Sequence, residues 1–507
     1  MSMHDWLPLL TLLTSFFTGV VIFFLQEQQV RTRSFLNMTG ASVKLVFVAL
    51  MLWGTFHEQS YETRFPLLGK IDLVLRADAL AMLFVGLSAL LWFLTTVYAI
   101  GYLEKSPHRS RFFGFFSICV TATVGIALAG NLLTFFVFYE LLTLSTYPLV
   151  VHRGTPEALK AGSKYLVYTL SGAAVLLLGM VWLYVLAGPI EFTAGGAISE
   201  HLGKTQQNTL IAIFVLLVAG LGVKAAIVPL HGWLPSAMVA PAPVSALLHA
   251  VAVVKAGAFG VVRVVYDVYG INLTESLGVT GPLAIIAAFS IIYGSIRALM
   301  QDDLKRRLAF STVSQLSYIT LGVAIVGPLS TIGGVVHLVH QGIMKITLFF
   351  CAGNLAETVG IHRISEMDGI GRRMPWTMTA FTVAAFGMIG LPPVAGFISK
   401  WYLGLGALQA GQGWGVVVLL VSTLLNAGYF LPILYVAWFK EPNPAWAERA
   451  PEDWWESDWR LLLPTLVTAF LSLTAGLLAG LPISPVGWVR MIVQQVYKLW
   501  MPFSGIP

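Results

Sequence analysis

Residues 224–255 read KAAIVPLHGWLPSAMVAPAPVSALLHAVAVVK, an apolar segment that begins and ends with lysine and contains Pro229 and Pro235. Proline lacks the backbone N–H that a helix needs, so it breaks or kinks the helix in which it lies. Charged side chains are rare inside membrane spans and usually functional. The segment therefore predicts a membrane protein with broken helices and buried charges.

The rest of the chain has the composition of a membrane protein. Hydrophobic residues make up 57% of it and charged residues 11%, with a mean hydropathy of +0.80, whereas soluble domains carry about 25% charged residues. A helix needs about 20 apolar residues to cross a bilayer, and we count about fourteen such runs. We therefore predict an all-α polytopic membrane protein that forms a single membrane domain over residues 1–507. The expected spans are 7–25, 43–56, 77–98, 112–130, 132–151, 165–187, 210–228, 244–269, 283–299, 308–326, 331–350, 378–405, 415–439 and 461–481. The first lacks the basic start and cleavage site of a signal peptide, so we expect it to be retained.

Basic residues divide unevenly between the connecting segments. Only six lie in the even-numbered loops and the C-terminal tail: Arg64, Lys70, Arg76, Lys204, Arg490 and Lys498. Eighteen lie in the odd-numbered loops: Arg31, Arg33, Lys44, Lys105, Arg109, Arg111, Arg153, Lys160, Lys164, Lys305, Arg306, Arg307, Arg363, Arg372, Arg373, Lys440, Arg449 and Arg460. The positive-inside rule places the odd loops in the cytoplasm and both termini outside. The net charge of +6 thus reflects orientation in a lipid bilayer rather than binding of nucleic acid.

The remaining basic residues lie within or at the edges of the spans. Arg263 and Arg297 are placed to reach an interface, but four lysines lie deeper or beside helix breaks: Lys224, Lys255, Lys345 and Lys400. A charge at the bilayer centre costs roughly 2.5–3.5 kcal/mol, so something must offset it.

Carboxylates are scarce in the same region. Glu140 is the one acidic residue well inside a predicted span, and Asp78 lies near the outer end of the third. One carboxylate neutralises one lysine, so the other lysines must be hydrated, hydrogen-bonded or deprotonated for part of the time. Such lysines are candidate proton carriers. A static pair of Glu140 with one lysine that only fixes helix packing is the simpler alternative, but it leaves three lysines unexplained.

Histidines extend the series of titratable groups: His231, His249, His337 and His340. His249 precedes Lys255 by six residues, and His337 precedes Lys345 by eight, which places the second pair on one helix face about two turns apart. Metal binding is the weaker interpretation, because one internal carboxylate and these spacings fit no familiar ligand set. Cys119 and Cys351 are isolated and indicate neither a disulfide nor a metal site.

A second break follows the pattern of the first, since Pro392 and Pro393 precede Lys400. Broken spans at corresponding places in two halves are typical of inverted-repeat transporters, where freed carbonyls and half-helix ends hold ions and water. The Trp-rich segment 446–459 is expected to lie in the interface.

With these motifs in hand, residues 112–401 resemble the antiporter-like subunits shared by Mrp cation/proton antiporters, respiratory complex I and membrane-bound hydrogenases. The resemblance rests on the opening segment, on FYELLTLSTYPLV with Glu140, on HLVHQGIMK, and on GLPPVAGFISKW with Lys400. It implies two inverted five-helix repeats, at 112–270 and 280–440, with flanking helices in 1–111 and an interfacial loop and last helix in 441–507. It also implies a hydrated polar axis at mid-membrane and a location in the cytoplasmic (inner) membrane of a prokaryote.

Carried over by motif, Glu140 and Lys224 resemble the family's charge pair, Lys255 its central lysine, and Lys400 the residue that faces the exit or the next subunit. His249 and His337 match family histidines, and Lys345 ends the HLVHQGIMK motif. This chain has Gln341 where the family often has the second histidine, with His340 beside it, which leaves the role of His340 open. In having Lys400, the chain is similar to the D-type subunit of Mrp antiporters.

The resemblance and the buried charges together predict a proton-translocating subunit of an Mrp-type cation (Na⁺)/H⁺ antiporter. Its partners would be other membrane subunits, and the transported ions would be protons and the sodium for which they are exchanged. We expect a transporter subunit rather than an enzyme, and no cofactor, because no phosphate-binding loop, iron–sulfur cysteine set or nicotinamide motif is present. The alternatives are a pumping subunit of a complex I-like or hydrogenase complex, a stand-alone secondary transporter, and a transport-inactive membrane scaffold.

Overall fold

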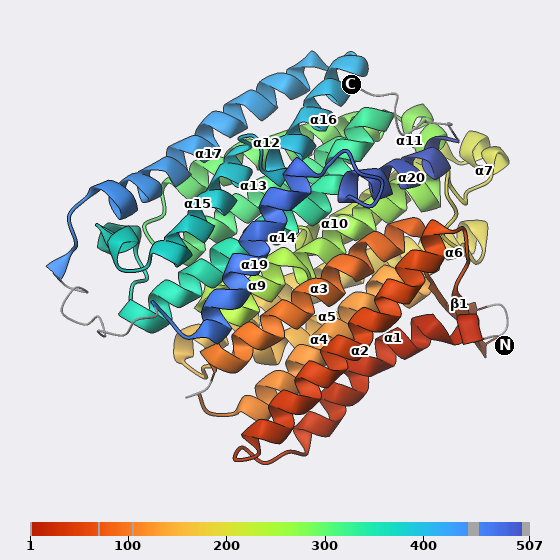
Figure 1. Cartoon of the computed structure of the whole chain (residues 1–507). Helices are drawn as coiled ribbons and strands as arrows, with labels where there is room; N and C mark the ends of the chain where they lie inside the picture. The colour runs from red at the N-terminus through yellow and green to blue at the C-terminus, as the bar shows by residue number, and fades with distance from the viewer. Residues whose placement is uncertain (1–2, 69–70, 104–105, 445–455, 499–507) are drawn as a thin grey trace.

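The computed structural model describes residues 3–68, 71–103, 106–444 and 456–498. These residues form a bundle of helices that run side by side, with one short hairpin at its edge (Figure 1). By length and composition, twelve helices within the described residues could cross a membrane. The prediction of an all-α polytopic membrane protein is confirmed.

The N-terminal quarter contains α1 (Met3–Phe23), α2 (Val30–Phe56), the antiparallel strands β1 (Glu62–Leu68) and β2 (Ile71–Arg76), α3 (Ala79–Tyr102) and α4 (Arg109–Leu128). Asp78 caps α3 by accepting a hydrogen bond of 2.7 Å from the backbone N of Ala81. Such a cap satisfies one of the orphan N–H groups of a helix start.

The predicted second span, 43–56, was too short, because α2 begins at Val30. Arg31, Arg33 and Lys44 therefore lie in a helix and not in a loop. The polar side chains of the first half of α2 that are buried, among them Arg33 and Lys44, lie on one stripe inside the bundle. Hydropathy does not show where such a helix begins, since the polar residues of its first half face protein rather than lipid.

The middle of the chain contains α5 (Leu132–Val150), α6 (Pro156–Ala187), α7 (Glu200–Thr205), α8 (Gln207–Lys224), η1 (Ser236–Val239), α9 (Ala242–Ala250), α10 (Val253–Arg263), the π-helical η2 (Val264–Tyr269) and α11 (Ile271–Ser276). As predicted, the helix before Pro229 is broken: α8 ends at Lys224 and turns lead to η1. A second interruption separates α9 from α10 between His249 and Lys255, although no proline marks it.

The second half contains α12 (Thr280–Leu299), α13 (Leu304–Ala324), α14 (Pro328–Val359), η3 (Ile364–Glu366), η4 (Ile370–Arg372), α15 (Pro375–Ile389), α16 (Ala395–Gln409), α17 (Gly413–Phe439), α19 (Trp459–Leu477) and α20 (Pro485–Tyr497). The predicted span 378–405 is divided at Pro392–Pro393 into α15 and α16. The other predicted span outside the twelve candidates is α13, whose many buried polar residues lower its hydropathy. The count of fourteen stays a prediction.

The division into two inverted repeats also stays a proposal. The order of the helices supports it. In the predicted repeat 112–270, the fourth long helix is α8, which is broken beside Lys224. In the predicted repeat 280–440, the fourth is the α15–α16 pair, which is broken near Lys400. The predicted interfacial segment 446–459 lies largely outside the described residues. The start of α1 and the end of α20 share one end of the bundle, because Thr63 on β1 bonds to Asp5 and a polar cavity joins residues 55–62 to Met491 and Gln494.

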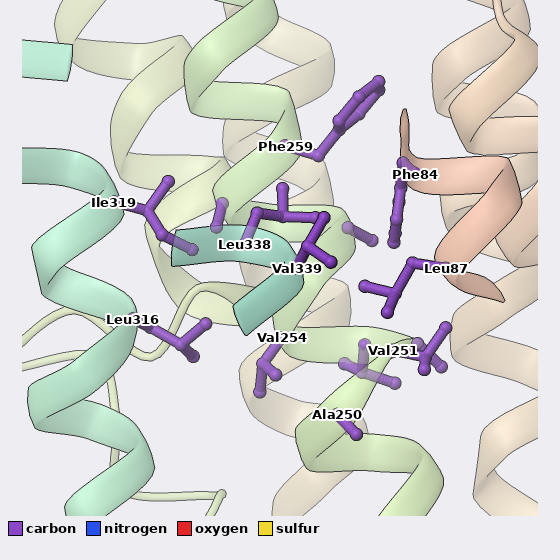
Figure 2. Close-up of a cluster of buried hydrophobic side chains, with 14 of the residues drawn as sticks. Phe84, Leu87, Ala250, Val251, Val254, Phe259, Leu316, Ile319, Leu338 and Val339 are labelled. Carbon is purple, nitrogen blue, oxygen red and sulfur yellow. The ribbon is translucent and has the colours of Figure 1, made fainter. Parts of the chain in front are cut away.

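Two helical segments, 242–269 and 328–359, form the buried centre of the bundle. Figure 2 shows the apolar side chains that surround them: Phe84 and Leu87 of α3, Ala250, Val251, Val254 and Phe259 of α9–α10, Leu316 and Ile319 of α13, and Leu338 and Val339 of α14. The rings of Phe84 and Phe259 lie 5.0 Å apart. This packing makes a low-dielectric setting in which every charge and hydrogen bond has a strong effect.

Candidate functional site

Lys224 lies in the last turn of α8 and is completely buried. Its Nζ donates to the main-chain O of Tyr139 on α5 and lies 3.3 Å from the centroid of the Tyr139 ring. The negative end of the helix dipole and the ring face both favour the charged ammonium. The break after α8 therefore places a lysine where backbone and ring can hold its charge.

Glu140 follows Tyr139 on α5 and is half-buried. Its Oε1 accepts from Thr143 Oγ1 at 3.3 Å. No contact within 4.0 Å joins the Glu140 carboxylate to Lys224, although their charges are close enough to interact. The predicted pair is therefore a long-range one in this structure, with Tyr139 between its members, and its role stays a prediction.

Lys255 lies in the first turn of α10 and is completely buried. Its Nζ has no hydrogen-bond partner among the described residues. His249, on the other side of the break, likewise has no partner at either ring nitrogen, and its ring stacks on Phe349 with centroids 4.6 Å apart. Buried polar groups are normally bonded to protein or ordered water. Both side chains are therefore suited to hydration at the centre of the bundle.

Gly257 brings the segment with Lys255 against the segment with Lys224. A Cβ at Gly257 would overlap the backbone N of Ala225 and lie 2.7 Å from the carbonyl carbon of Lys224. Only glycine permits two backbones to approach this closely. The backbone of Lys224 therefore contacts α10 at Gly257, two residues after Lys255.

One stripe of α13 connects the other predicted residues. Ser311, Gln315 and Tyr318 follow a spacing of four and then three residues, which places them on one helix face. Ser311 accepts from Lys345 Nζ, and Gln315 Oε1 lies 3.1 Å from Nε2 of His337. Tyr318 contacts the His337 ring at 5.3 Å between centroids and the Lys400 ammonium at 5.4 Å. Three uncharged residues of α13 therefore connect Lys345, His337 and Lys400. They were not predicted from the sequence, although their spacing on one helix face could have indicated them.

Lys400 lies on α16, and its Nζ donates to the carbonyl oxygens of Met388 at 3.1 Å and Ile389 at 2.7 Å. These carbonyls belong to the last turn of α15, which the break has freed from helical hydrogen bonding. Ser399, its neighbour, bonds to Nδ1 of His337 at 2.8 Å. At Lys400, the end of a broken helix therefore holds the ammonium, whereas at Lys224 the carbonyl and ring of Tyr139 in the middle of α5 do so.

The remaining predicted residues are placed less directly. His231 follows Pro229 in the turns after α8 and packs edge-on against Tyr293 at 5.1 Å. His340 and Gln341 lie fully buried on α14, and none of their side-chain polar atoms has a partner among the described residues. They are buried beside the site, but no hydrogen bond connects them to it.

Arg263 is not an interfacial arginine as predicted. It is buried, and its guanidinium bonds to both carboxylate oxygens of Asp78, at 2.8 and 2.9 Å, and to Asp267 at 2.7 Å. Asp267 follows Arg263 by four residues, a spacing that the sequence displays, whereas Asp78 lies far from Arg263 in sequence and only the fold brings these two together. In the described part of the chain, no group of three or more His, Cys, Asp or Glu side chains could hold a metal ion.

The arrangement is a line of titratable groups. Its interior members, Lys224, Lys255, Lys345, His249 and His337, are completely buried, whereas Glu140 and Lys400 at the two ends are half-buried. Figure 1 shows α5 and α16 on opposite sides of α10. Lysine and histidine side chains can each take up and release a proton, so these groups have the chemistry that a proton path needs.

Comparison with known proteins finds relatives along most of the chain. The family model described as NADH:quinone oxidoreductase/Mrp antiporter, TM, matches residues 129–426, and the one described as NADH-Ubiquinone oxidoreductase (complex I), chain 5 N-terminus, matches residues 68–113. The chain is 38% identical over 389 residues to NADH-quinone oxidoreductase subunit N of Desulforudis audaxviator (strain MP104C), covering 75% of each protein. It is 29% identical over 407 residues to the D subunit of the Na⁺/H⁺ antiporter of Bacillus subtilis (strain 168), covering 80% of each. Its fold matches a chain of the Mrp complex from Dietzia sp. DQ12-45-1b with a TM-score of 0.83 at 22% identity, covering 98% of both chains.

Proposed function

Because the chain belongs to the NADH:quinone oxidoreductase/Mrp antiporter membrane family, we propose that it is the proton-translocating subunit of a multi-subunit Mrp-type Na⁺/H⁺ antiporter. The motifs around Glu140, Lys224 and Lys400 predicted this family from the sequence. Family members named above are subunits of a quinone oxidoreductase and of an antiporter.

The observation that carries the proposal is the stripe on α13 that joins Lys345, His337 and Lys400. A helix-packing role would need each lysine to be paired, but Lys255 has no partner among the described residues and Lys345 is held only by a hydroxyl and a carbonyl. Buried lysines held by neutral groups can release their protons without leaving a carboxylate unpaired. This property suits carriers and not structural ion pairs.

The proposed mechanism is electrostatic. When Glu140 is charged it favours a charged Lys224, and a change in that interaction alters the proton affinity of Lys255 and then of the groups that lead to Lys400. Gly257 keeps the Lys224 and Lys255 segments in contact, so a movement of the end of α8 would displace the start of α10.

The two half-buried ends support action within a complex. A carboxylate or ammonium at mid-span is costly against lipid and needs a polar neighbour. Glu140 and Lys400 would each find that neighbour on an adjacent membrane subunit, which makes the line continuous across the assembly. The driving force would then come from a partner subunit or an ion gradient.

A second candidate is a pumping subunit of a redox-driven complex, favoured by the 38% identity to a quinone oxidoreductase subunit. Purification of the complex in mild detergent separates the two. An antiporter subunit should copurify with membrane subunits alone, and vesicles with that complex should acidify or alkalinise in response to a sodium gradient. Copurification with iron–sulfur or flavin subunits, and proton movement only on addition of reductant, would overturn the antiporter assignment. Full proton flux by the purified single chain would instead indicate a stand-alone transporter.

A further inference from the structure

Lys44 is a buried lysine that the Glu140–Lys400 line does not use. It lies in the middle of α2 and is completely buried. Its Nζ donates to Ser15 Oγ of α1 at 2.6 Å and lies 4.8 Å from the ring centroid of Trp92 on α3. Ser15 Oγ in turn shares a hydrogen bond of 2.8 Å with Thr121 Oγ1 of α4. Four helices thus meet around one ammonium group.

No charge of opposite sign balances Lys44. Among the described residues, no carboxylate lies within 4.0 Å of its Nζ, and no titratable side chain of the packed helices α1, α3 and α4 exerts a resolved effect on it. A hydroxyl and a ring face favour the ammonium, while burial disfavours it. Both protonation states are therefore accessible to Lys44.

Along the buried stripe of α2, the charged and amide side chains lead to Lys44 from one end of the bundle. The buried stripe of α2 reads Arg33, Asn37, Ala41 and Lys44, and continues with Val48 and Met51. Arg33 donates to Ser110 Oγ at the start of α4 at 2.8 Å. At about 1.5 Å rise per residue, Lys44 lies roughly 16 Å from this end. The stripe is polar up to Lys44 and apolar beyond it.

Several buried polar atoms near Lys44 have no partner among the described residues, including Trp92 Nε1 and Ser88 Oγ on α3. Asn37 uses its Nδ2 to bond Arg33 O at 3.0 Å, but its Oδ1 is buried and unpaired, as is Ser117 Oγ on α4, one turn before Thr121. Buried polar atoms of native proteins are almost always paired with protein or ordered water. A water molecule between Arg33 and Lys44 would supply a partner to Asn37 Oδ1 and to Ser117 Oγ.

We propose that Lys44 is a proton-binding residue at the blind end of a water-filled half-channel formed by α1, α2 and α4, with its mouth at Arg33 and Ser110. This proposal rests on the proposed function in supposing that the chain moves protons. Phe84 and Leu87 of α3 point toward the α9–α10 segment (Figure 2), and the Phe84 ring lies 5.0 Å from that of Phe259, so apolar side chains cover this face of α3. The hydrogen-bonded end of the half-channel reaches α4, which packs on α5, the helix of Glu140. Loading of Lys44 therefore places a positive charge on the Glu140 side of the line.

Thiol labelling tests the half-channel without any assay of transport. In a background with Cys119→Ala and Cys351→Ala, single cysteines are placed at Asn37, Ala41, Val48 and Met51, all on the same buried stripe. A small water-soluble methanethiosulfonate should label the assembled protein at positions 37 and 41 and leave 48 and 51 unlabelled. Labelling at neither 37 nor 41 would show a dry stripe, and labelling at all four would show that no blind end exists at Lys44. Either result overturns the proposal.

Proton flux in vesicles, normalised to assembled complex, tests the binding role. Lys44→Met should lower the flux by roughly tenfold or more, the effect of losing one acid–base group. Lys44→Arg keeps the charge but cannot release a proton in the working range, so it should be equally impaired. Wild-type flux in Lys44→Arg would assign Lys44 to helix packing alone, and wild-type flux in Lys44→Met would exclude it altogether. If the proposed function itself fails, no variant will show flux, while the labelling pattern will still stand.

Discussion

His337 is held at both ring nitrogens, by Ser399 on α16 and by Gln315 on α13. A histidine with two fixed partners has a defined tautomer and ring orientation, which a proton carrier needs if it is to accept on one side and donate on the other. The surrounding side chains of α13 also contact Lys345 and Lys400. Gln315 therefore positions His337 without being able to titrate itself.

Gln315→Leu should lower proton flux by roughly tenfold or more while assembly of the complex is retained, because a histidine that loses a fixed partner transfers protons less well. The measurement is proton flux in vesicles, normalised to assembled complex. Ser317→Ala is the matched control, since Ser317 is buried on the same helix but bonds only to Val313 O. A Gln315→Leu variant as active as Ser317→Ala would remove Gln315 from the account.

Charged members of the site could be predicted from the sequence because lysine, glutamate and histidine are conspicuous in apolar spans. Gln315, Ser311 and Tyr318 could not, since uncharged polar residues are tolerated in any buried helix. Arg263 was misread for a different reason: its partner Asp78 comes from another helix, and only the fold brings them within 2.8 Å.

At the scale of elements, the helix breaks create the ammonium sites. Lys224 ends α8, and Lys400 bonds to the last carbonyls of α15. Breaks at prolines are readable from the sequence, because proline removes a helix donor. The break between α9 and α10 and the early start of α2 are not, since tertiary packing decides both.

The pair of Glu140 on α5 and Lys224 on α8 can be tested as a unit. Glu140→Gln and Lys224→Ala should each impair proton flux, and the double variant should recover assembly but not flux if the pair is a switch. Each single change leaves the other charge without its counter-charge, and removing both charges relieves this, so the double variant should recover assembly. The four proteins are compared by flux in vesicles, normalised to assembled complex. Near wild-type flux in the double variant would reduce the pair to a packing device.

The β1–β2 hairpin depends on pH through Glu191, in the segment after α6. Arg64 and Arg76 bond to Glu191 at 2.7 and 2.5 Å. The hydrogen bond from Arg64, with that from Arg76, holds the pKa of Glu191 below its ordinary 4.5, against the effect of burial. A lowered pKa stabilises the folded hairpin above the ordinary pKa, and this stabilisation is lost as the pH falls through the lowered value.

Hydrogen exchange of the hairpin amides should therefore be faster in Glu191→Gln than in the wild type at pH 7, and the difference should vanish in acid. Glu200→Gln, an exposed carboxylate at the start of α7, is the control and should match the wild type throughout. A difference between Glu191→Gln and wild type that is the same at pH 7 and in acid would contradict the linkage.

At the scale of the whole molecule, the number and nature of the helices follow from hydropathy, because a backbone in lipid must satisfy its own hydrogen bonds. Which helices become the buried centre does not. The most apolar 18-residue stretch of the helix 328–359 is completely buried, but it is no more apolar than the corresponding stretches of helices on the surface. Neighbour relations depend on side-chain packing that no single sequence displays.

The orientation of the whole chain in the membrane can be tested with fused reporters. A reporter fused after Arg372 should be cytoplasmic, and one fused at the C-terminus should be external, because basic residues concentrate in the odd-numbered connections even when Arg31, Arg33 and Lys44 are assigned to α2. Enzymatic reporters active on only one side of the membrane make the measurement. Both reporters on one side would contradict both the orientation and the number of crossings.

The central claim is that protons pass through Lys255, the buried lysine at the middle of the line, and its alanine variant tests this most directly. Lys255 is completely buried and its Nζ has no partner among the described residues, so Lys255→Ala should leave folding and assembly nearly intact, since removing an unpaired buried charge is neutral or stabilising. We predict that vesicles with the assembled Lys255→Ala complex will show almost no proton flux under a gradient that drives the wild type. Wild-type flux in an equally well-assembled variant would contradict the relay.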